Sequence, residues 1–396
     1  MPVNTVPTAD WVTLEQLAED PYPVYDRLRA VGPVTWAPQL GRFLLTGLDD
    51  CRFVEANEDL FEIEQEDSPL KRAMGEVMLS KNEPEHGVER AAINPALRPK
   101  VIAEVWRAHF EAHARQVLER FRGLGPGADI NADFALPYAA MNLGVVVGLP
   151  DVPWTDVQRW SLAFIAAVAN VQEDPRVSEA NRIANAEADA AIDRRMAELA
   201  GSADPSMISV MLRAGLPPDL VRANAKLAIS GGVNEPQHVL TSGVHALSQH
   251  PDQLAAVRAG EYTYTQVFDE VVRWMPPIHT LMRRARVDVE LNGVTMPAGS
   301  LVWILLGAAN RDPRHFEQPD RFVVSRPRRP HLAFGSGPHI CAGSWAARSS
   351  IAEVAWPLLY DGLPGLTPVD DDARFHGFFF RGLPGLPVTW ETENTK

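Results

Sequence analysis

The sequence predicts a mainly α-helical fold with a minor β region, and three patterns support this prediction. Arg182–Ala200 is rich in Ala, Glu and Arg and stops at Gly201, which is typical of a helix with a C-terminal glycine. A second, longer helical pattern lies in the middle of the chain. Strand signals cluster after it, because Val287–Leu291, the turn Asn292-Gly293 and the apolar run Leu301–Leu306 read as a hairpin-like unit.

The long central helix is predicted over Leu220–Gln249, and Pro251 closes it. Its middle holds Gly231-Gly232 and Pro236, which weaken the backbone hydrogen bonds there because glycine is flexible and proline has no N–H.

Composition and charge narrow the class of protein. The 396 residues are 46% hydrophobic and 22% charged, as in a globular protein with a sizeable core. The formal net charge of -14 argues against nucleic-acid binding, which usually needs a basic surface. We find no linker, no signal-peptide pattern and no uninterrupted apolar run that spans a bilayer. We therefore expect a single domain over residues 1–396, no membrane association and a cytoplasmic location.

The two cysteines, Cys51 and Cys341, lie too far apart to indicate a disulfide framework, a zinc site or an iron–sulfur cluster. Two glycines and a proline precede Cys341 and predict a tight loop, and Ala342–Leu359 has helical composition. Cys341 would then lie just before a helix N-terminus, where a thiolate is stabilised. Such a thiolate is a strong axial ligand for haem iron.

The residues around Cys341 carry a family resemblance. Phe334, Gly337, Cys341 and Gly343 match the Phe-x-x-Gly-x-x-x-Cys-x-Gly haem-binding loop of the cytochrome P-450 family. The resemblance implies the P-450 fold with heme b (iron protoporphyrin IX) between the long central helix and the helix that follows the loop. It also implies that Cys341 is the iron ligand, that Phe334 packs under the sulfur and that the glycines let the backbone approach the porphyrin.

Glu270 and Arg273 fit the Glu-x-x-Arg element of the same family. Residues at i and i+3 share a helix face, so this pair can form an ion pair. Arg321, in Pro319-Asp320-Arg321-Phe322, matches the arginine that completes the ion-pair network of the family, and Arg326 is a weaker candidate for this third member.

Four cationic or donor side chains match the propionate contacts of the family. His86 and Arg90 are four residues apart, which places both on one helix face. Arg283 and His339 match two further contacts. A buried porphyrin needs such partners for its two propionates.

The central helix departs from the family pattern at the acid–alcohol pair that relays protons to dioxygen. Aligning Gly232 with the family glycine puts Asn234 at the acid position and Glu235 at the alcohol position. A shift by one residue puts Glu235 at the acid position and Pro236 at the alcohol position. Both alignments lack the threonine, and Glu235 can itself carry protons. Asn234 and Glu235 are therefore the candidate catalytic residues. This variant resembles a bacterial subgroup that demethylates guaiacol-type methoxylated aromatics.

The resemblance also indicates which side chains lie over the haem. These are mostly apolar and suit a small hydrophobic or aromatic substrate. They are Phe164, Val168, Val233, Ile278, Leu281, Phe378 and Phe380.

The leading hypothesis is a haem-thiolate monooxygenase that uses dioxygen and two electrons to O-demethylate a methoxylated aromatic, giving a phenol and formaldehyde. The chain shows no flavin or iron–sulfur motif, so the electrons come from a separate NAD(P)H-dependent reductase or ferredoxin. Two alternatives remain open. One is a hydroxylase of a terpene, steroid or other natural product. The other is a non-catalytic haem sensor or ligand-binding protein.

Overall fold

The computed structural model describes residues 6–63, 68–170, 173–370 and 372–392. Within these ranges the chain forms two compact units, each built from separate segments of sequence. The first unit comprises residues 6–63, 245–341 and 372–384, and the second comprises residues 68–170, 173–244, 342–370 and 385–392. The single domain over residues 1–396 stays a prediction.

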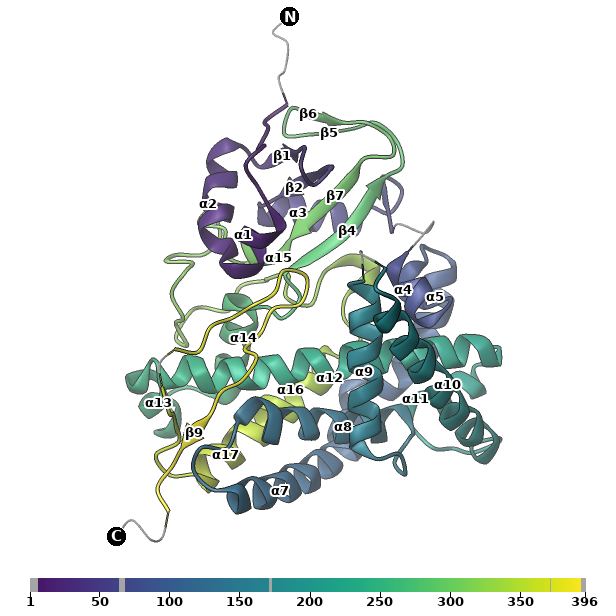
Figure 1. Cartoon of the computed structure of the whole chain (residues 1–396), viewed down its shortest axis with the longest axis vertical. Helices are drawn as coiled ribbons and strands as arrows, with labels where there is room; N and C mark the ends of the chain where they lie inside the picture. The colour runs from purple at the N-terminus through teal and green to yellow at the C-terminus, as the bar shows by residue number, and fades with distance from the viewer. Residues whose placement is uncertain (1–5, 64–67, 171–172, 371, 393–396) are drawn as a thin grey trace, which may run out of the picture. The chain divides into compact units, whose positions relative to one another are not determined.

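A five-stranded sheet organises the first unit (Figure 1). Its strand order is β1-β2-β7-β4-β3, in which β2 and β7 are parallel and the other neighbours are antiparallel. The strands are β1 Val34–Ala37, β2 Arg42–Leu45, β3 Phe61–Glu62, β4 Thr280–Ala285 and β7 Leu301–Leu305. Segments from the two ends of the sequence therefore build one sheet.

Both faces of this sheet are buried, which explains why Leu301–Leu305 is a continuous apolar run. Side chains alternate between the faces along a strand. Trp303 and Leu305 pack with Leu17, Val24 and Leu28 from the N-terminal helices. Val302 and Ile304 belong to a different cluster that contains Cys51 and Val54.

Two of the longer helices of the first unit begin at side-chain caps. The Asp20 side chain caps α2, and Thr263 with Gln266 forms a capping box at the start of α14. The helices are α1 Leu14–Glu19, α2 Pro21–Val31, α3 Leu48–Ala56, α13 Pro251–Arg258, α14 Tyr264–Trp274, α15 Leu306–Ala309 and the 3₁₀ turn Gly337–His339.

The hairpin-like prediction is correct for the turn and wrong for one strand. β5 Val289–Leu291 pairs with β6 Val294–Met296 across Asn292-Gly293, whose φ angles are 52° and 76°. These positive angles suit asparagine and glycine in a two-residue hairpin turn. The run Leu301–Leu305 pairs instead with β2 and β4, because a buried strand needs hydrogen-bond partners for its backbone groups at both edges.

The second unit is almost entirely helical. Its segments before the long helix are α4 Pro69–Met74, the 3₁₀ turn Met78–Ser80, α5 Glu85–Ile93, the 3₁₀ turn Asn94–Leu97, α6 Pro99–Val101, the π-helix Ile102–Trp106, α7 Arg107–Leu124, the π-helix Ile130–Ala135, α8 Leu136–Val147, α9 Trp154–Val168, α10 Pro175–Glu198 and α11 Met207–Arg213. After it come α16 Ser344–Arg348, the π-helix Ser349–Ala355, α17 Trp356–Gly362, and the paired strands β8 Thr367–Pro368 and β9 Val388–Thr389.

The long central helix α12, Pro218–Ser248, confirms the prediction for Leu220–Gln249. It runs through Pro236, and its last residues belong to the first unit. In the second unit it packs on the helical segment after the cysteine loop. The Trp356 indole N–H donates to the Leu240 carbonyl at 3.1 Å, and a Cβ added at Gly243 would lie 2.0 Å from the Trp356 ring. Gly243 therefore permits this close packing.

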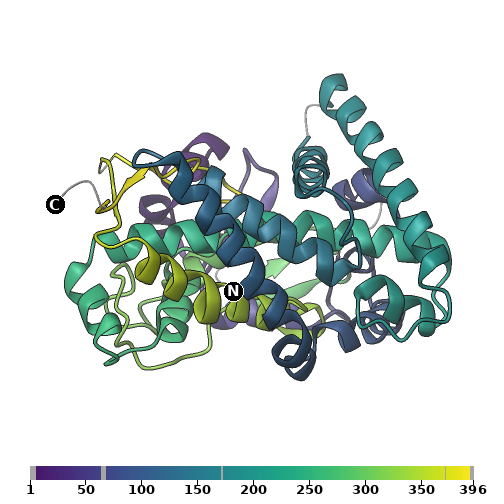
Figure 2. The same ribbon diagram turned by 90° about the horizontal axis from the view of Figure 1, so that it is seen from below.

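Figure 2 shows α7 and the segment α16–α17 lying side by side in the second unit, in agreement with their contacts. Behind them, the window Ile130–Val147 is apolar and long enough to span a membrane by composition. It is 67% buried within the protein and contains Asp133 and Asn142. These features are typical of a core helix.

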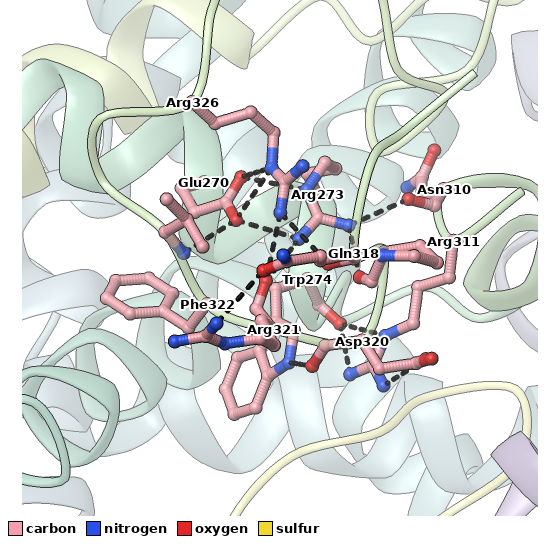
Figure 3. Close-up of polar contacts among 12 residues, drawn as sticks. Glu270, Arg273, Trp274, Asn310, Arg311, Gln318, Asp320, Arg321, Phe322 and Arg326 are labelled. Atoms are coloured by element: carbon pink, nitrogen blue, oxygen red, sulfur yellow. Dashed lines mark hydrogen bonds and ion pairs between the residues drawn. The ribbon is translucent and has the colours of Figure 1, made fainter. Parts of the chain in front are cut away.

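A buried ion-pair network in the first unit joins α14 to the segments that lead into the cysteine loop (Figure 3). Arg273 donates from Nε and Nη2 to both oxygens of Glu270, each at 2.8 Å. Its remaining bonds go to the carbonyls of Asn310, Pro319 and Arg321 at 2.8–3.0 Å. These bonds engage every N–H of the guanidinium, so Arg273 is fully satisfied in a site where it is 2% exposed.

The third member of this network, beside Glu270 and Arg273, is Arg326, and the prediction of Arg321 is wrong. Arg326 donates from Nε to the two Glu270 oxygens at 3.1 and 3.2 Å. The exposed Arg321 side chain instead donates to the Gln318 amide oxygen at 2.9 Å. Arg321 serves the network through its backbone carbonyl, which any residue type provides.

This arrangement predicts unequal costs of removing the two arginines. Arg326→Ala deletes a charge-assisted bond to a carboxylate that is 4% exposed, and we expect a loss of about 1.5–3 kcal/mol in the free energy of unfolding. Arg321→Ala keeps the carbonyl and should stay within ~0.5 kcal/mol of wild type. Denaturant midpoints followed by circular dichroism measure both. Equal losses in the two variants would contradict the assignment.

Candidate haem-binding site

The cysteine loop in the first unit is a compact backbone structure. The Leu332 N–H donates to the Asn310 side-chain oxygen at 2.7 Å, which ties the start of the loop to the ion-pair segment. Farther on, the Cys341 N–H donates to the Phe334 carbonyl at 2.9 Å. Gly335 and Gly337 both have φ of +67°, a conformation that side chains other than glycine rarely adopt. The tight loop predicted before Cys341 is present.

Cys341 ends this loop with an exposed side chain and forms no disulfide. Gly343 is the N-cap of α16, and helical structure continues from Ser344 to Gly362. The predicted position of Cys341 just ahead of a helix therefore agrees with the structure. Phe334 stacks on Phe268 with ring centroids 6.1 Å apart, so its ring is held next to α14.

The predicted propionate contacts of the first unit, Arg283 and His339, lie in an acidic setting. Arg283 is 5% exposed on β4, and burial lowers its pKa while the carboxylates of Glu55 and Glu58 oppose that shift. His339 Nε2 lies 2.8 Å from Glu58 Oε1. The sequence analysis missed Glu55 and Glu58, because no local pattern links them to a loop that is remote in sequence.

The other two predicted contacts, His86 and Arg90, share helix α5 in the second unit. The His86 side chain is 2% exposed, and its Nδ1 lies 2.9 Å from Glu83 Oε1. Arg90 is half-buried and donates from Nε to the Asn94 side-chain oxygen at 2.8 Å. Both side chains are thus oriented by polar neighbours, and their role toward propionates stays a prediction.

The centre of α12 carries buried polar atoms around Pro236. Asn234 is 8% exposed, and among the described residues neither its Nδ2 nor Oε2 of Glu235 has a hydrogen-bond partner. Burial raises the pKa of Glu235 to about 8. The same helix turn holds His238, whose pKa burial lowers to about 4. At neutral pH we therefore expect Glu235 to be protonated. His238, three residues later on the same helix, should be neutral.

Small residues make room for this carboxyl group. A Cβ added at Gly231, one turn earlier, would lie 3.8 Å from both Glu235 oxygens, so the carboxyl group lies over that glycine. A Cβ at Gly232 would meet the Leu143 side chain at 2.4 Å, which shows how closely α8 approaches α12.

The predicted substrate contacts fall into both units. In the second unit Phe164 and Val233 are buried and Val168 is half-buried. In the first unit Ile278 forms an isolated antiparallel bridge with Phe380, and Ile278 and Leu281 also pack on a core cluster. Phe378 belongs to the core of that unit, with its ring centroid 4.8 Å from Trp303. Core packing therefore accounts for Phe378, and a substrate role for the others stays a prediction.

The residues present fit a haem. Gly337 lets the cysteine loop pack closely on the end of α3, since a Cβ there would lie 2.9 Å from the Glu55 carbonyl oxygen. Cys341 supplies an exposed thiol at the end of this loop. Arg283, His339, His86 and Arg90 supply cationic or donor groups of the kind that propionates need. The unpartnered amide of Asn234 offers a further donor on α12.

Comparisons with known proteins agree with these features. A sequence model described as Cytochrome P450 matches residues 245–352. "Biotin biosynthesis cytochrome P450" of Bacillus subtilis (strain 168) is 30% identical over 395 residues, covering 95% of this chain and 98% of the relative. "6-deoxyerythronolide B hydroxylase" of Saccharopolyspora erythraea is 28% identical over 400 residues, covering 93% of this chain and 96% of the relative.

The fold comparison gives the same result. The crystal structure of P450BioI in complex with hexadec-9Z-enoic acid ligated acyl carrier protein matches with a TM-score of 0.87 and 28% identity, over 96% of this chain and 100% of that chain. Near full-length similarity to a relative at 30% identity, together with the cysteine loop, establishes the family. The chain belongs to the cytochrome P450 family and is a haem b-binding monooxygenase of that family.

Proposed function

We propose that this cytochrome P450 O-demethylates a small methoxylated aromatic compound, with Cys341 as the iron ligand. The observation that carries the proposal is the Asn234-Glu235-Pro236 turn of α12, where a buried carboxyl group stands at the acid or the alcohol position and the usual threonine is missing. The buried Phe164 and Val233 of the same unit support an apolar, aromatic substrate. We further propose that the protein works in the cytoplasm.

The bound haem supplies activation of dioxygen and oxidation of a C–H bond. The overall reaction consumes the methyl ether, dioxygen, two electrons and two protons, and it yields a phenol, formaldehyde and water. The chain contributes the groups that hold the haem and deliver the protons. The electrons come from a separate NAD(P)H-dependent reductase or ferredoxin, because two cysteines cannot hold an iron–sulfur cluster in this chain.

Glu235 and Asn234 handle protons in this proposal. With a pKa of about 8, the Glu235 carboxyl is mostly protonated at neutral pH and can donate a proton. Asn234 offers a buried N–H donor that orients an oxygen acceptor. Burial thus gives a carboxyl group the donor role that a hydroxyl group plays in other members of the family.

Hydroxylation of a terpene, steroid or other natural product is the second candidate. The relative whose printed name is "6-deoxyerythronolide B hydroxylase" favours it. The two reactions share the oxidation of a C–H bond and differ in what becomes of the product. Only the demethylation releases formaldehyde.

Removing the proposed iron ligand should change the haem spectrum. The reduced carbon-monoxide complex of wild type should show the far-red-shifted Soret band of a thiolate ligand. Cys341→Ser should lose that band, whereas Cys51→Ser, at a buried thiol in the sheet core, should keep it. A wild-type spectrum of the histidine type that Cys341→Ser leaves unaltered would show that the assignment is wrong.

The raised pKa of Glu235 predicts opposite pH dependences for the two oxidants. The dioxygen route needs the protonated carboxyl, so its rate should fall as pH rises through about 8. Peroxide-driven turnover needs the ionised form as a base, so it should rise roughly tenfold between pH 7 and the plateau above pH 8.

Three variants test this assignment under both oxidants. Glu235→Gln and Glu235→Thr should both lose most peroxide-driven turnover and its pH dependence, and Glu235→Thr should retain part of the dioxygen route. Asp219→Asn, an exposed carboxylate at the start of α12, serves as the control and should behave like wild type. Equal peroxide activity in all proteins would remove Glu235 from the mechanism.

Substrate binding identifies the compound class without turnover, because a bound substrate displaces water from the iron and shifts the Soret band. We expect methoxyphenols, alkylated guaiacols or methoxybenzoates to give the largest spin-state shift, with terpenes and steroids weaker. Turnover with a reductase should then release formaldehyde equal to the NADH oxidised. Larger shifts with terpenes or steroids, and hydroxylated product without formaldehyde, would support the second candidate instead. Binding without turnover would indicate a sensor.

A further inference from the structure

A buried carboxylate holds the cysteine loop from outside the family motif. Glu55 lies in the last turn of α3 in the first unit and is 1% exposed. Its Oε2 accepts a hydrogen bond from the Ser336 hydroxyl at 3.0 Å, and the Ser336 backbone bonds to the same carboxylate. Ser336 lies between the two glycines with positive φ. Glu55 therefore holds the loop at Ser336, between the two glycines.

Gly335 and Gly337 leave the space that Glu55 and the end of α3 occupy. A Cβ at Gly335 would lie 3.1 Å from Glu55 Oε1, and a Cβ at Gly337 would lie 2.9 Å from the Glu55 carbonyl oxygen and 3.0 Å from Ala56 Cα. The loop can approach the end of α3 only because both positions lack side chains. The conformation of the loop and the position of Glu55 thus depend on each other.

Glu55 also faces the cations assigned to haem propionates. Arg283 on β4 interacts electrostatically with Glu55 and with Glu58, and His339 on the loop lies against Glu58. On α3 itself, Arg52 is the other charged group that acts on Glu55. Two carboxylates already face Arg283 and His339, so two added propionates would leave an excess of negative charge in a buried site.

We propose that Glu55 is a positioning residue that fastens the cysteine loop to α3 and becomes protonated when the haem propionates bind Arg283 and His339. The proposal rests on the propionate roles proposed for those two side chains. A neutral Glu55 keeps its place beside Ser336, and it relieves the excess of negative charge.

Glu55 changes its ionisation state near neutral pH. Burial raises its pKa to about 7, against the opposing effects of Arg283, Ser336 and Arg52. Below that pH the carboxyl is neutral, and above it the carboxylate places a negative charge near the haem. The bound propionates move the titration of Glu55 upward from this value. Negative charge favours ferric over ferrous iron, so the midpoint potential of the haem should fall as pH rises above about 7.

The test measures this potential in the holoenzyme from pH about 6 to about 10, a range that extends well above the pKa of Glu55 without haem. Wild type should show the fall, and Glu55→Gln should remain at the low-pH value throughout, because glutamine is neutral at every pH. Asp50→Asn is the matched control. Asp50 lies on the same helix, is 7% exposed and bonds to Asn292 instead of the loop. It should keep the wild-type pH dependence.

A second readout tests the fastening. In Glu55→Ala, the thiolate-type carbon-monoxide band should change to the histidine-type band several-fold faster than in wild type. In Glu55→Gln, the thiolate-type band should last nearly as long as in wild type, because the glutamine amide oxygen still accepts a hydrogen bond from Ser336. A pH-dependent potential in Glu55→Gln, a flat potential in wild type, or a Glu55→Ala band as durable as wild type would overturn the proposal. If Glu55→Ala fails to fold, Glu55→Gln and Asp50→Asn still decide it. Failure of the proposed function looks different, because wild type would then keep the pH-dependent potential and the thiolate band but release no formaldehyde from methoxylated aromatics.

Discussion

The pairing of Glu270 with Arg273 is the constraint on which the first unit depends. A buried ion pair is costly to desolvate and stabilises a fold only when its remaining donors and acceptors are satisfied. Here every guanidinium N–H of Arg273 is used, and Glu270 also accepts the Val323 N–H at 2.9 Å. These bonds recruit backbone groups from several loops, so irregular segments acquire fixed positions. The Asn310 carbonyl is one of them, and the Asn310 side chain holds the start of the cysteine loop.

The cysteine loop is therefore fastened at two points by different chemistry. The Asn310 side-chain oxygen accepts a hydrogen bond from the Leu332 N–H. The buried Glu55 carboxylate accepts one from the Ser336 hydroxyl. Between and after these points the Gly335 and Gly337 conformations set the direction of the chain toward Cys341. An exposed thiol in a loop usually samples many positions, and the two attachments restrict the loop that carries it. The order of the loop comes from residues outside its motif.

Local sequence patterns predicted the regular elements well and the long-range contacts poorly. Composition was enough to predict α12, since Pro218–Ser248 nearly equals the expected Leu220–Gln249. The start of α10 was predicted less well, because this helix begins at Pro175 and not at the expected Arg182. The predicted pairing of Leu301–Leu305 was wrong, because its strand partners come from distant parts of the sequence that local patterns do not connect. Arg321 and Arg326 are both plausible in sequence, and the structure separates them because only the Arg326 side chain donates to Glu270. Glu55 had no signal, because it meets Ser336 across 281 residues.

The centre of α12 shows how burial reverses an expectation based on residue type. A glutamate in water is ionised at neutral pH and reads as a base. Within the helix, desolvation raises its pKa to about 8, so the same side chain carries a proton under those conditions. Pro236, which has no N–H, leaves the Gly232 carbonyl without its helical donor and concentrates unsatisfied polar groups at this turn. Buried polar groups without partners are costly, and a fold retains them where a ligand or reaction uses them. This turn is therefore the part of α12 to which the proposed proton transfer is assigned.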